Sequence, residues 1–213
     1  MKNVIPNFVV FEGTDGSGTT TQLSRLDKRL SESGFSRPAY FLTCEPTNSP
    51  VGALIRSALK KDIGLHADTL ARLFAADRCE HLYGEGGIVQ RCSRGELVIC
   101  DRYILSSLVY QGLECGDELP QELNGSFPVP ELIIHLDLDS EIAQQRLNDR
   151  AVREIYENLE FQRKVRDKYL SLLDGCRKEG SRVELIDAAQ SLENVSGQVW
   201  RIVSDLPIFK PGF

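Results

Sequence analysis

A glycine-rich stretch near the start of the chain carries residue types that bind phosphate. The segment Gly13-Thr14-Asp15-Gly16-Ser17-Gly18-Thr19-Thr20 begins one residue after the apolar run Asn7–Phe11. Leucines at positions 23, 26 and 30 mark one helix face after it. Glycines let the backbone turn tightly and direct successive N–H groups inward, and a helix start adds partial positive charge. This order predicts a phosphate loop over residues 13–20. A glycine-rich turn without a ligand is the alternative.

Two positions of this loop decide what chemistry it supports. Thr20 stands in the Ser/Thr position whose hydroxyl binds Mg²⁺, but the preceding position, where the motif has lysine, is Thr19. A lysine there reaches the β- and γ-phosphates of a nucleotide. Threonine donates one neutral hydrogen bond over a shorter reach, so the loop has lost a cation.

Asp101 and Arg102 come directly after a second apolar run, Leu97–Cys100. The planar fork of donors on Arg102 suits bidentate binding of a phosphate, although a salt bridge to a surface carboxylate is an alternative. Asp101 stands where an acid assists Mg²⁺, and it is equally suited to brace the phosphate loop. Cys100 ends the apolar run and is expected to be a small core residue.

Phe74 and Arg78 are four residues apart in a segment with a helical pattern, so they share one helix face. An aromatic ring stacks on a nucleobase, and a guanidinium on the same face hydrogen-bonds the edge of that base. By periodicity alone Phe74 is a core residue, which is the competing interpretation.

Short apolar runs alternate with longer helical patterns along the chain. This alternation predicts an α/β fold with a parallel sheet and helices on both sides, in which ligands bind at the carboxyl ends of the strands. The expected strands are Asn7–Phe11, Ala39–Leu42, Leu97–Cys100, Leu132–Leu138 and Arg182–Ile186. The expected helices after the first are Val51–Leu59, Leu70–Leu82, Ile142–Leu147, Tyr156–Leu173 and Leu192–Val203. Gly84–Gly87 should break the central helix, and Gly112–Pro130 is predicted to be a loop.

Composition and charge narrow the class of protein. The 213 residues suffice for one domain, 1–213, with 41% apolar and 26% charged residues. A net charge of −6 argues against a non-specific nucleic-acid binder, and no apolar run is long enough to span a membrane. The six cysteines lack metal-ligand spacing and the first residues lack a signal-peptide pattern, so reduced thiols in a cytoplasmic protein are expected.

Motifs in most of the chain, in a consistent order, resemble those of the thymidylate kinase family. The first is Phe-Glu-Gly-Thr-Asp-Gly-Ser-Gly-x-Thr-Thr-Gln from Phe11 onward. The others are Thr43-Cys44-Glu45-Pro46, Leu73-Phe74-Ala75-Ala76-Asp77-Arg78, Asp101-Arg102-Tyr103 with Ser106-Ser107 and Tyr110-Gln111-Gly112, Pro130-Glu131-Leu132 with Leu136-Asp137, and Tyr156-Glu157-Asn158 with Phe161-Gln162.

The resemblance implies a P-loop NTPase fold, three-layer αβα, with a five-stranded parallel sheet and a short lid at about residues 146–155. It also implies Mg²⁺-dependent transfer of the ATP γ-phosphoryl group to dTMP, giving dTDP in pyrimidine deoxynucleotide synthesis. A homodimer in the cytoplasm, without nucleic-acid or membrane partners, is the expected state.

Carried over position by position, the resemblance also implies a set of site residues. ATP and its phosphates would bind Gly13, Asp15, Gly16, Ser17, Gly18, Thr19, Thr20 and Arg146. The dTMP molecule would bind Glu45, Arg56, Phe74, Arg78, Arg102, Ser107, Tyr110 and Gln111, with a solvated helix charge as the alternative for Arg56. Mg²⁺ would be held by Thr20, Asp15 and Asp101, and Arg102 and Asp15 would act in catalysis.

Family members place a catalytic arginine either in the phosphate loop or on the lid. Position 16 is glycine here, so Arg150 or Arg153 on the lid would supply this arginine. A solvated basic helix end is the alternative interpretation of that segment.

Two departures from the family pattern put the activity in question. Cys44 replaces the arginine of T-R-E-P, and Thr19 replaces the loop lysine. Losing one preorganised donor to a transition state costs about 3–4 kcal/mol, which slows an enzyme without abolishing its activity. A nucleotide-binding protein with weak or no catalysis, and a kinase for another monophosphate such as dUMP, are the alternative functions.

Overall fold

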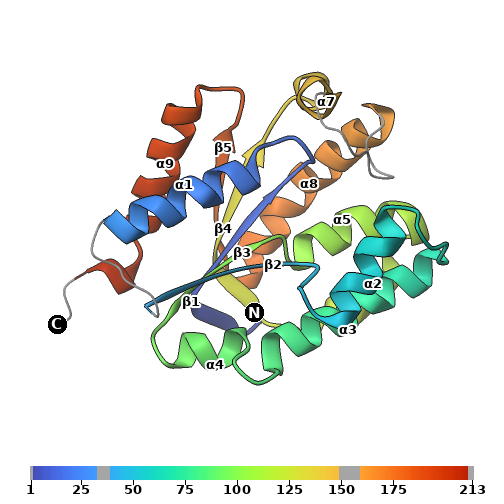
Figure 1. The fold of residues 1–213 in the computed structure, drawn as a ribbon, viewed down its shortest axis with the longest axis horizontal. Coiled ribbons are helices and arrows are strands. Elements are labelled where there is room, and N and C mark those ends of the chain that lie inside the picture. Colours follow the sequence, from blue (N-terminus) through green and yellow to red (C-terminus); the bar gives the residue numbers. More distant parts are fainter. Residues whose placement is uncertain (1, 33–38, 149–158, 211–213) are drawn as a thin grey trace.

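The computed structural model describes residues 2–32, 39–148 and 159–210. In this part of the chain, a parallel sheet of five strands in the order β2-β3-β1-β4-β5 lies between helices (Figure 1). The strands are β1 (Val4–Gly13), β2 (Tyr40–Cys44), β3 (Leu97–Asp101), β4 (Val129–Asp137) and β5 (Arg182–Asp187). The helices are α1 (Thr19–Glu32), α2 (Pro50–Leu59), α3 (Ala67–Tyr83), α4 (Ile88–Ser93), α5 (Ile104–Cys115), α6 (Glu118–Asn124), α7 (Ser140–Asn148), α8 (Leu159–Glu179) and α9 (Leu192–Ser204), followed by a 3₁₀ turn, η1 (Pro207–Phe209).

The two faces of the sheet pack against different helices, as the alternation of side chains along β1 shows. Val9 and Phe11 point to the core formed with α1 and α9. Phe8 and Val10 point to the opposite core, formed with α3, α4 and the start of α5. Helices α2, α5 and α8 pack on the same side as this second core, while α1 and α9 lie together on the first side (Figure 1). Both faces are therefore buried, which explains the nearly continuous apolar runs.

The predicted sheet is confirmed, with each expected strand present to within a few residues at its ends. The helical patterns at Val51–Leu59, Leu70–Leu82, Ile142–Leu147 and Leu192–Val203 correspond to α2, α3, α7 and α9. The pattern at Tyr156–Leu173 corresponds to α8, which is described from Leu159 onward, so its predicted start lies outside the described residues.

The prediction of a loop over Gly112–Pro130 is wrong. Helix α5 continues to Cys115, α6 occupies Glu118–Asn124, and β4 already begins at Val129. Pro120 lies in the first turn of α6, where its missing N–H has no partner within the helix, so proline does not prevent a helix there. The break at Gly84–Gly87 is confirmed, since α3 ends at Tyr83 and Gly87 precedes the short helix α4.

Helix α2 is fixed to α3 by one buried carboxylate. Asp77 on α3 accepts hydrogen bonds from Thr47 N at 2.7 Å, Thr47 Oγ1 at 2.6 Å and Ser49 Oγ at 2.8 Å. Ser49 in turn caps α2 by accepting from Gly52 N. These bonds set where α2, and with it Arg56, lies relative to α3.

Within the described residues, no helix has the length and apolar character needed to cross a membrane. Each of the six cysteines is a free thiol, and Cys100 is fully buried in the core as predicted.

Candidate functional site

A cavity of about 430 Å³ opens where the carboxyl ends of β1, β2 and β3 meet. Parallel strands end at the same edge of a sheet, which brings together residues far apart in the sequence. Most of the site residues expected from the sequence line this cavity: Asp15, Gly16, Gly18, Thr19, Thr20, Glu45, Arg56, Phe74, Arg78, Asp101, Arg102, Ser107, Tyr110 and Gln111.

The loop between β1 and α1 has a backbone that needs glycine at two points. Gly16 and Gly18 have φ values of +86° and +96°, in the left-handed region. Gly16 also lies against α7, because a Cβ atom built on it would be 2.8 Å from the carbonyl oxygen of Ala143. An arginine side chain at position 16 is therefore sterically excluded in this arrangement.

The hydroxyls of Thr14 and Ser17 are buried in this loop and have no hydrogen-bond partner among the described residues. Such unpaired buried groups are costly unless a ligand completes them. Gly13 and Ser17 lie behind the cavity wall rather than on it, since the cavity-lining loop residues include neither. Of these two hydroxyls, only that of Thr14 belongs to a residue that lines the cavity, where an acceptor such as a phosphate oxygen could meet it.

Asp101, at the end of β3, faces the first turn of α1. Its Oδ2 accepts from Thr20 Oγ1 at 3.3 Å, while no described residue hydrogen-bonds its buried Oδ1. Burial raises the pKa of Asp101, against the charge of Arg102 and the hydrogen bonds of Thr19 and Thr20.

A hydroxyl beside a carboxylate with an unpaired oxygen suits Mg²⁺, which prefers hard oxygen ligands and takes the remainder from water and phosphates. In the described ranges, no group of three or more His, Cys, Asp or Glu side chains is arranged as a metal cage. Thr20 and Asp101 offer oxygen donors of the kind that Mg²⁺ prefers.

Arg102 occupies the strand-to-helix turn with a left-handed backbone, φ +69°, and its N–H donates to Phe11 O at 2.8 Å. Its Nη2 donates to Asp15 Oδ1 at 2.5 Å, and the ring of Tyr110 lies 5.2 Å from its guanidinium. The alternative of a surface salt bridge does not describe this pair, because both side chains are about four-fifths buried and Asp15 belongs to the phosphate loop. Arg102 thus presents a cation to the cavity beside the loop.

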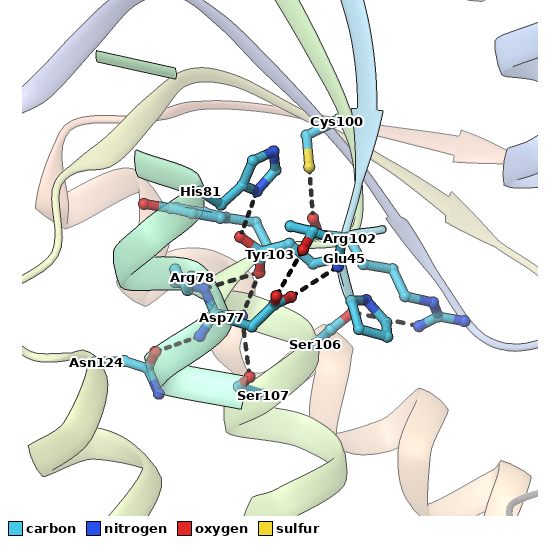
Figure 2. Close-up of polar contacts among 12 residues, drawn as sticks. Glu45, Asp77, Arg78, His81, Cys100, Arg102, Tyr103, Ser106, Ser107 and Asn124 are labelled. Atoms are coloured by element: carbon cyan, nitrogen blue, oxygen red, sulfur yellow. Dashed lines mark hydrogen bonds and ion pairs between the residues drawn. The ribbon is translucent and has the colours of Figure 1, made fainter. Parts of the chain in front are cut away.

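Arg78 is 1% exposed and makes an ion pair with Glu45, which is 4% exposed. Its Nε and Nη2 donate to Glu45 Oε2 at 2.9 and 2.6 Å, Nη2 also donates to Ser107 Oγ at 3.1 Å, and Nη1 donates to Asn124 Oδ1. Figure 2 shows Arg78 held between these three partners. The protein thereby fixes the plane of the guanidinium before any ligand arrives.

Glu45 is held from its other side by His81, whose Nδ1 lies 3.1 Å from Glu45 Oε1 and whose Nε2 lies 2.7 Å from Thr43 Oγ1. The carboxylate expected to meet a ligand is therefore bonded to protein groups on both oxygens. Next to it, the thiol of Cys44 lines the cavity, and burial raises its pKa, so Cys44 offers no charge in place of the family's arginine.

Phe74 is half-buried, and its position is compatible with both interpretations of it, as a core residue and as a ring that stacks on a base. It packs on the core of α2, α5 and α8 and also lines the cavity. Arg56 lines the same cavity and donates to Pro46 O at 2.8 Å, so it is not a freely solvated helix charge. Ser107, Tyr110 and Gln111 present the buried face of α5.

Arg146 on α7 does not line the cavity. Its Nη1 donates to Gly16 O at 3.4 Å and its Nη2 to Ala188 O at 3.1 Å, so it joins the phosphate loop to the segment after β5. The lid arginines Arg150 and Arg153 lie outside the described residues, as does most of the predicted lid at 146–155.

Sequence reasoning missed the residues that hold the site from behind. These are Glu12, His81, Asn124, Tyr169, and Ser106 in its role as a hydrogen-bond partner of Arg102. Glu12 left one signal, a charged residue inside an apolar strand, which indicates a buried partner. Asn124 lay in the segment predicted to be a loop, and Tyr169 lay in a helix without any local motif.

The sequence model of the thymidylate kinase family matches residues 11–199. The chain belongs to the thymidylate kinase family. It is 41% identical over 206 residues to a probable thymidylate kinase of Pyrobaculum aerophilum, covering 95% of this chain and 99% of that protein. It is 36% identical over 208 residues to a thymidylate kinase of Symbiobacterium thermophilum, covering 93% of each, and 38% identical over 207 residues to a probable thymidylate kinase of Pyrococcus abyssi, covering 92% and 95%.

The contact between Gly16 and α7 in this thymidylate kinase family member yields a prediction with an internal control. Gly16→Ala and Gly18→Ala both place a side chain at positive φ, which costs about 1–2 kcal/mol. Only the first adds a clash, since a Cβ on Gly18 meets no described atom within 4 Å. Urea unfolding should show that Gly16→Ala destabilises the protein more than Gly18→Ala. Equal losses would mean that α7 moves aside freely.

Proposed function

We propose that this chain transfers the γ-phosphoryl group of ATP to the phosphate of dTMP. The observation that carries the proposal is one cavity shared by a phosphate loop and by the Phe74–Arg78 face of α3, in a chain that belongs to the thymidylate kinase family. A triphosphate on the loop and a monophosphate with its base on α3 would meet beside Arg102.

The acceptor phosphate is already an anion, so no general base is needed to create a nucleophile. The protein's tasks are alignment and neutralisation of charge on the transferred group. Arg102 and Arg56 are the cations assigned to the acceptor phosphate, and Phe74 with Arg78 to the base. Glu45, Ser107, Tyr110 and Gln111 complete the dTMP site.

Gly13, Asp15, Gly16, Ser17, Gly18, Thr19 and Thr20 are assigned to the ATP phosphates, and Arg146 to ATP through its hold on the loop. Thr20 and Asp101, with Asp15, are assigned to Mg²⁺, which neutralises phosphate charge when it is bound. Arg150 or Arg153 is assigned to the transferred group. In this proposal, Asp15 gives up Arg102 to the acceptor phosphate and becomes available to the metal or the sugar.

The family resemblance also supports a homodimer and a cytoplasmic location, which we include in the proposal. We also propose that residues 1–213 form a single kinase domain, with ATP and dTMP as its small-molecule partners.

The proposal is tested by a coupled assay of ADP release with Mg²⁺-ATP and a panel of dTMP, dUMP, CMP and dGMP. We expect kcat/KM to be highest for dTMP. A preference for dUMP would change the base assignment, and binding of dTMP without turnover would indicate a nucleotide-binding protein.

Phe74→Ala should raise the KM for dTMP far more than the KM for ATP. A stacked base contributes about 1–3 kcal/mol, which corresponds to roughly 5- to 150-fold in affinity. Steady-state kinetics with each substrate varied in turn measures the effect. Equal changes in both KM values would remove Phe74 from the base site, and Leu73→Ala on the same helix is a packing control.

Thr19→Lys should raise kcat by about tenfold or more, with a smaller change in the KM for dTMP, because it restores a cation next to the transferred phosphate. Two arrangements predict different results. If the lid arginines already replace the lysine, Thr19→Lys adds little, and Arg150→Ala or Arg153→Ala abolishes activity. We expect the larger rise, because the lid arginine is already needed in place of the loop arginine that is absent at Gly16, and so does not also replace the lysine. An improvement confined to dTMP affinity would contradict the assignment of position 19 to ATP.

A further inference from the structure

Arg102 is held by two hydroxyl groups on the side away from Asp15. Its Nη1 donates to Ser106 Oγ at 3.2 Å and to Tyr169 OH at 3.2 Å, while Nη2 is the nitrogen bonded to Asp15. The two hydroxyl oxygens are 2.8 Å apart. One edge of the guanidinium is thus fixed to the protein interior, and the other faces the phosphate loop.

Both hydroxyls converge on one oxygen of a fully buried carboxyl group. Glu12 Oε2 accepts from Ser106 Oγ at 2.6 Å and from Tyr169 OH at 3.1 Å. Glu12 Oε1 has a separate task, since it accepts from the backbone N–H groups of Tyr103 at 2.9 Å and Ser106 at 3.3 Å, at the start of α5. The side chain points away from the α1 and α9 face because it continues the alternation of Phe8 and Val10 along β1.

The direction of these hydrogen bonds follows from the chemistry of the groups. An ionised carboxylate only accepts, so the Ser106 proton points to Glu12 and the Tyr169 proton points to Glu12 or to Ser106 Oγ. In either case the lone pairs of both hydroxyls face Arg102, which can only donate. Glu12 therefore determines in which direction the hydroxyls of Ser106 and Tyr169 donate, and through them how the guanidinium of Arg102 is bound.

We propose that Glu12, acting through the hydroxyls of Ser106 and Tyr169, is the positioning residue that holds Arg102 in line for the acceptor phosphate. The inference rests on the proposed function, because it takes Arg102 as a ligand of that phosphate. Glu12 lines no part of the cavity, so it positions Arg102 without touching the substrate. In this proposal the acceptor phosphate displaces Asp15 from Arg102, whereas the hydroxyls of Ser106 and Tyr169 remain hydrogen-bonded to Arg102.

Glu12→Gln separates this role from the capping of α5. The amide oxygen can still accept from the two backbone N–H groups, while an NH₂ group replaces Oε2 and donates where the carboxylate accepted. One hydroxyl proton can then point to the other hydroxyl, and the remaining proton must turn towards Arg102. At pH 8 we expect the KM for dTMP to rise about tenfold, because displacement of a positioned group by a fraction of an ångström is that costly, while the KM for ATP changes less than about twofold. The control is Glu131→Gln, whose carboxylate binds Asn7 N at 2.6 Å near the start of β1.

Tyr169→Phe removes one hydroxyl while it keeps the ring. It should also raise the KM for dTMP, by a smaller factor, because Ser106 still holds Arg102. The matched control is Tyr40→Phe, since Tyr40 is 3% exposed and its hydroxyl binds Asp27 Oδ1 at 2.8 Å on the α1 side of the sheet. This control should leave both KM values unchanged.

A double-mutant cycle tests whether Glu12 acts through Arg102. Arg102→Ala alone should lower kcat/KM for dTMP more than tenfold, about the loss of a bidentate charge-assisted contact. Adding Glu12→Gln to Arg102→Ala should cause no further loss, because the group that Glu12 positions is gone. Additive losses would show that Glu12 serves the fold and not Arg102.

The pH profile gives a readout that a structural role would not move. Burial raises the pKa of Glu12 to about 7, against the hydrogen bond of Ser106 and the charge of Arg102, and a protonated Glu12 presents a donor as glutamine does. The groups around it keep their charge between pH 6 and 8. Burial lowers the pKa of His135 on β4 to about 4 and raises that of Cys176 on α8 to about 12. Burial also raises the pKa values of Tyr169 and Cys100 well above their usual values.

The advantage of the parent over Glu12→Gln in kcat/KM for dTMP should therefore shrink from about tenfold at pH 8 to about twofold at pH 6. Titration of the dTMP phosphate affects both proteins equally. A ratio that stays constant with pH, or an unchanged KM for dTMP in a folded Glu12→Gln protein, would overturn the inference.

The two proposals fail in different ways. If the parent turns over another monophosphate but not dTMP, the proposed base is wrong, and the same ratios measured with that substrate still decide the role of Glu12. If the parent binds dTMP without turnover, calorimetric Kd values replace KM in the same comparison. A parent that neither binds nor phosphorylates a monophosphate would overturn both proposals.

Discussion

Strand β1 is hydrogen-bonded to β3 along one edge and to β4 along the other, and from Phe8 onward its side chains are buried on both faces. The strand ends at Gly13, where the phosphate loop begins. On the same strand, Phe11 O accepts a hydrogen bond from the N–H of Arg102, and the carboxylate of Glu12 accepts one from the N–H of Tyr103 at the start of α5. The loop and the arginine beside it are thus positioned by one rigid element, as a site that aligns two phosphates requires.

Buried charge in this molecule is placed where it organises the cavity. Desolvating Arg78 and Glu45 carries a penalty of several kcal/mol per ion, which only good geometry and additional hydrogen bonds offset. Asn124, Ser107 and His81 supply those bonds. The cost is met during folding, so these groups need little reorganisation when a ligand enters.

How much of this was accessible from the sequence depends on the range of the interactions. The strands and the glycine loop were predictable, because each depends on the types of a few consecutive residues. Phe74 and Arg78 were recognisable by their spacing on one helix. The roles of Glu12, Asn124 and Tyr169 were not predictable. Their hydrogen-bond partners Tyr103, Arg78 and Glu12 lie 91, 46 and 157 residues away in the sequence, and only packing brings them together. The loop predicted over Gly112–Pro130 failed because proline and glycine were taken as breaks, without regard to where in a helix turn they fall.

The close approach of Gly16 to Ala143 also constrains how such a protein can evolve. The family resemblance implies a catalytic arginine either in the phosphate loop or on the lid, and at loop position 16 this chain has no room for a Cβ atom, which would lie 2.8 Å from a backbone oxygen. A single substitution at position 16 would meet that oxygen before the new side chain reached any phosphate. The backbone of α7 would have to shift first, so the exchange is epistatic. We therefore expect an arginine at position 16 to require accompanying changes in α7.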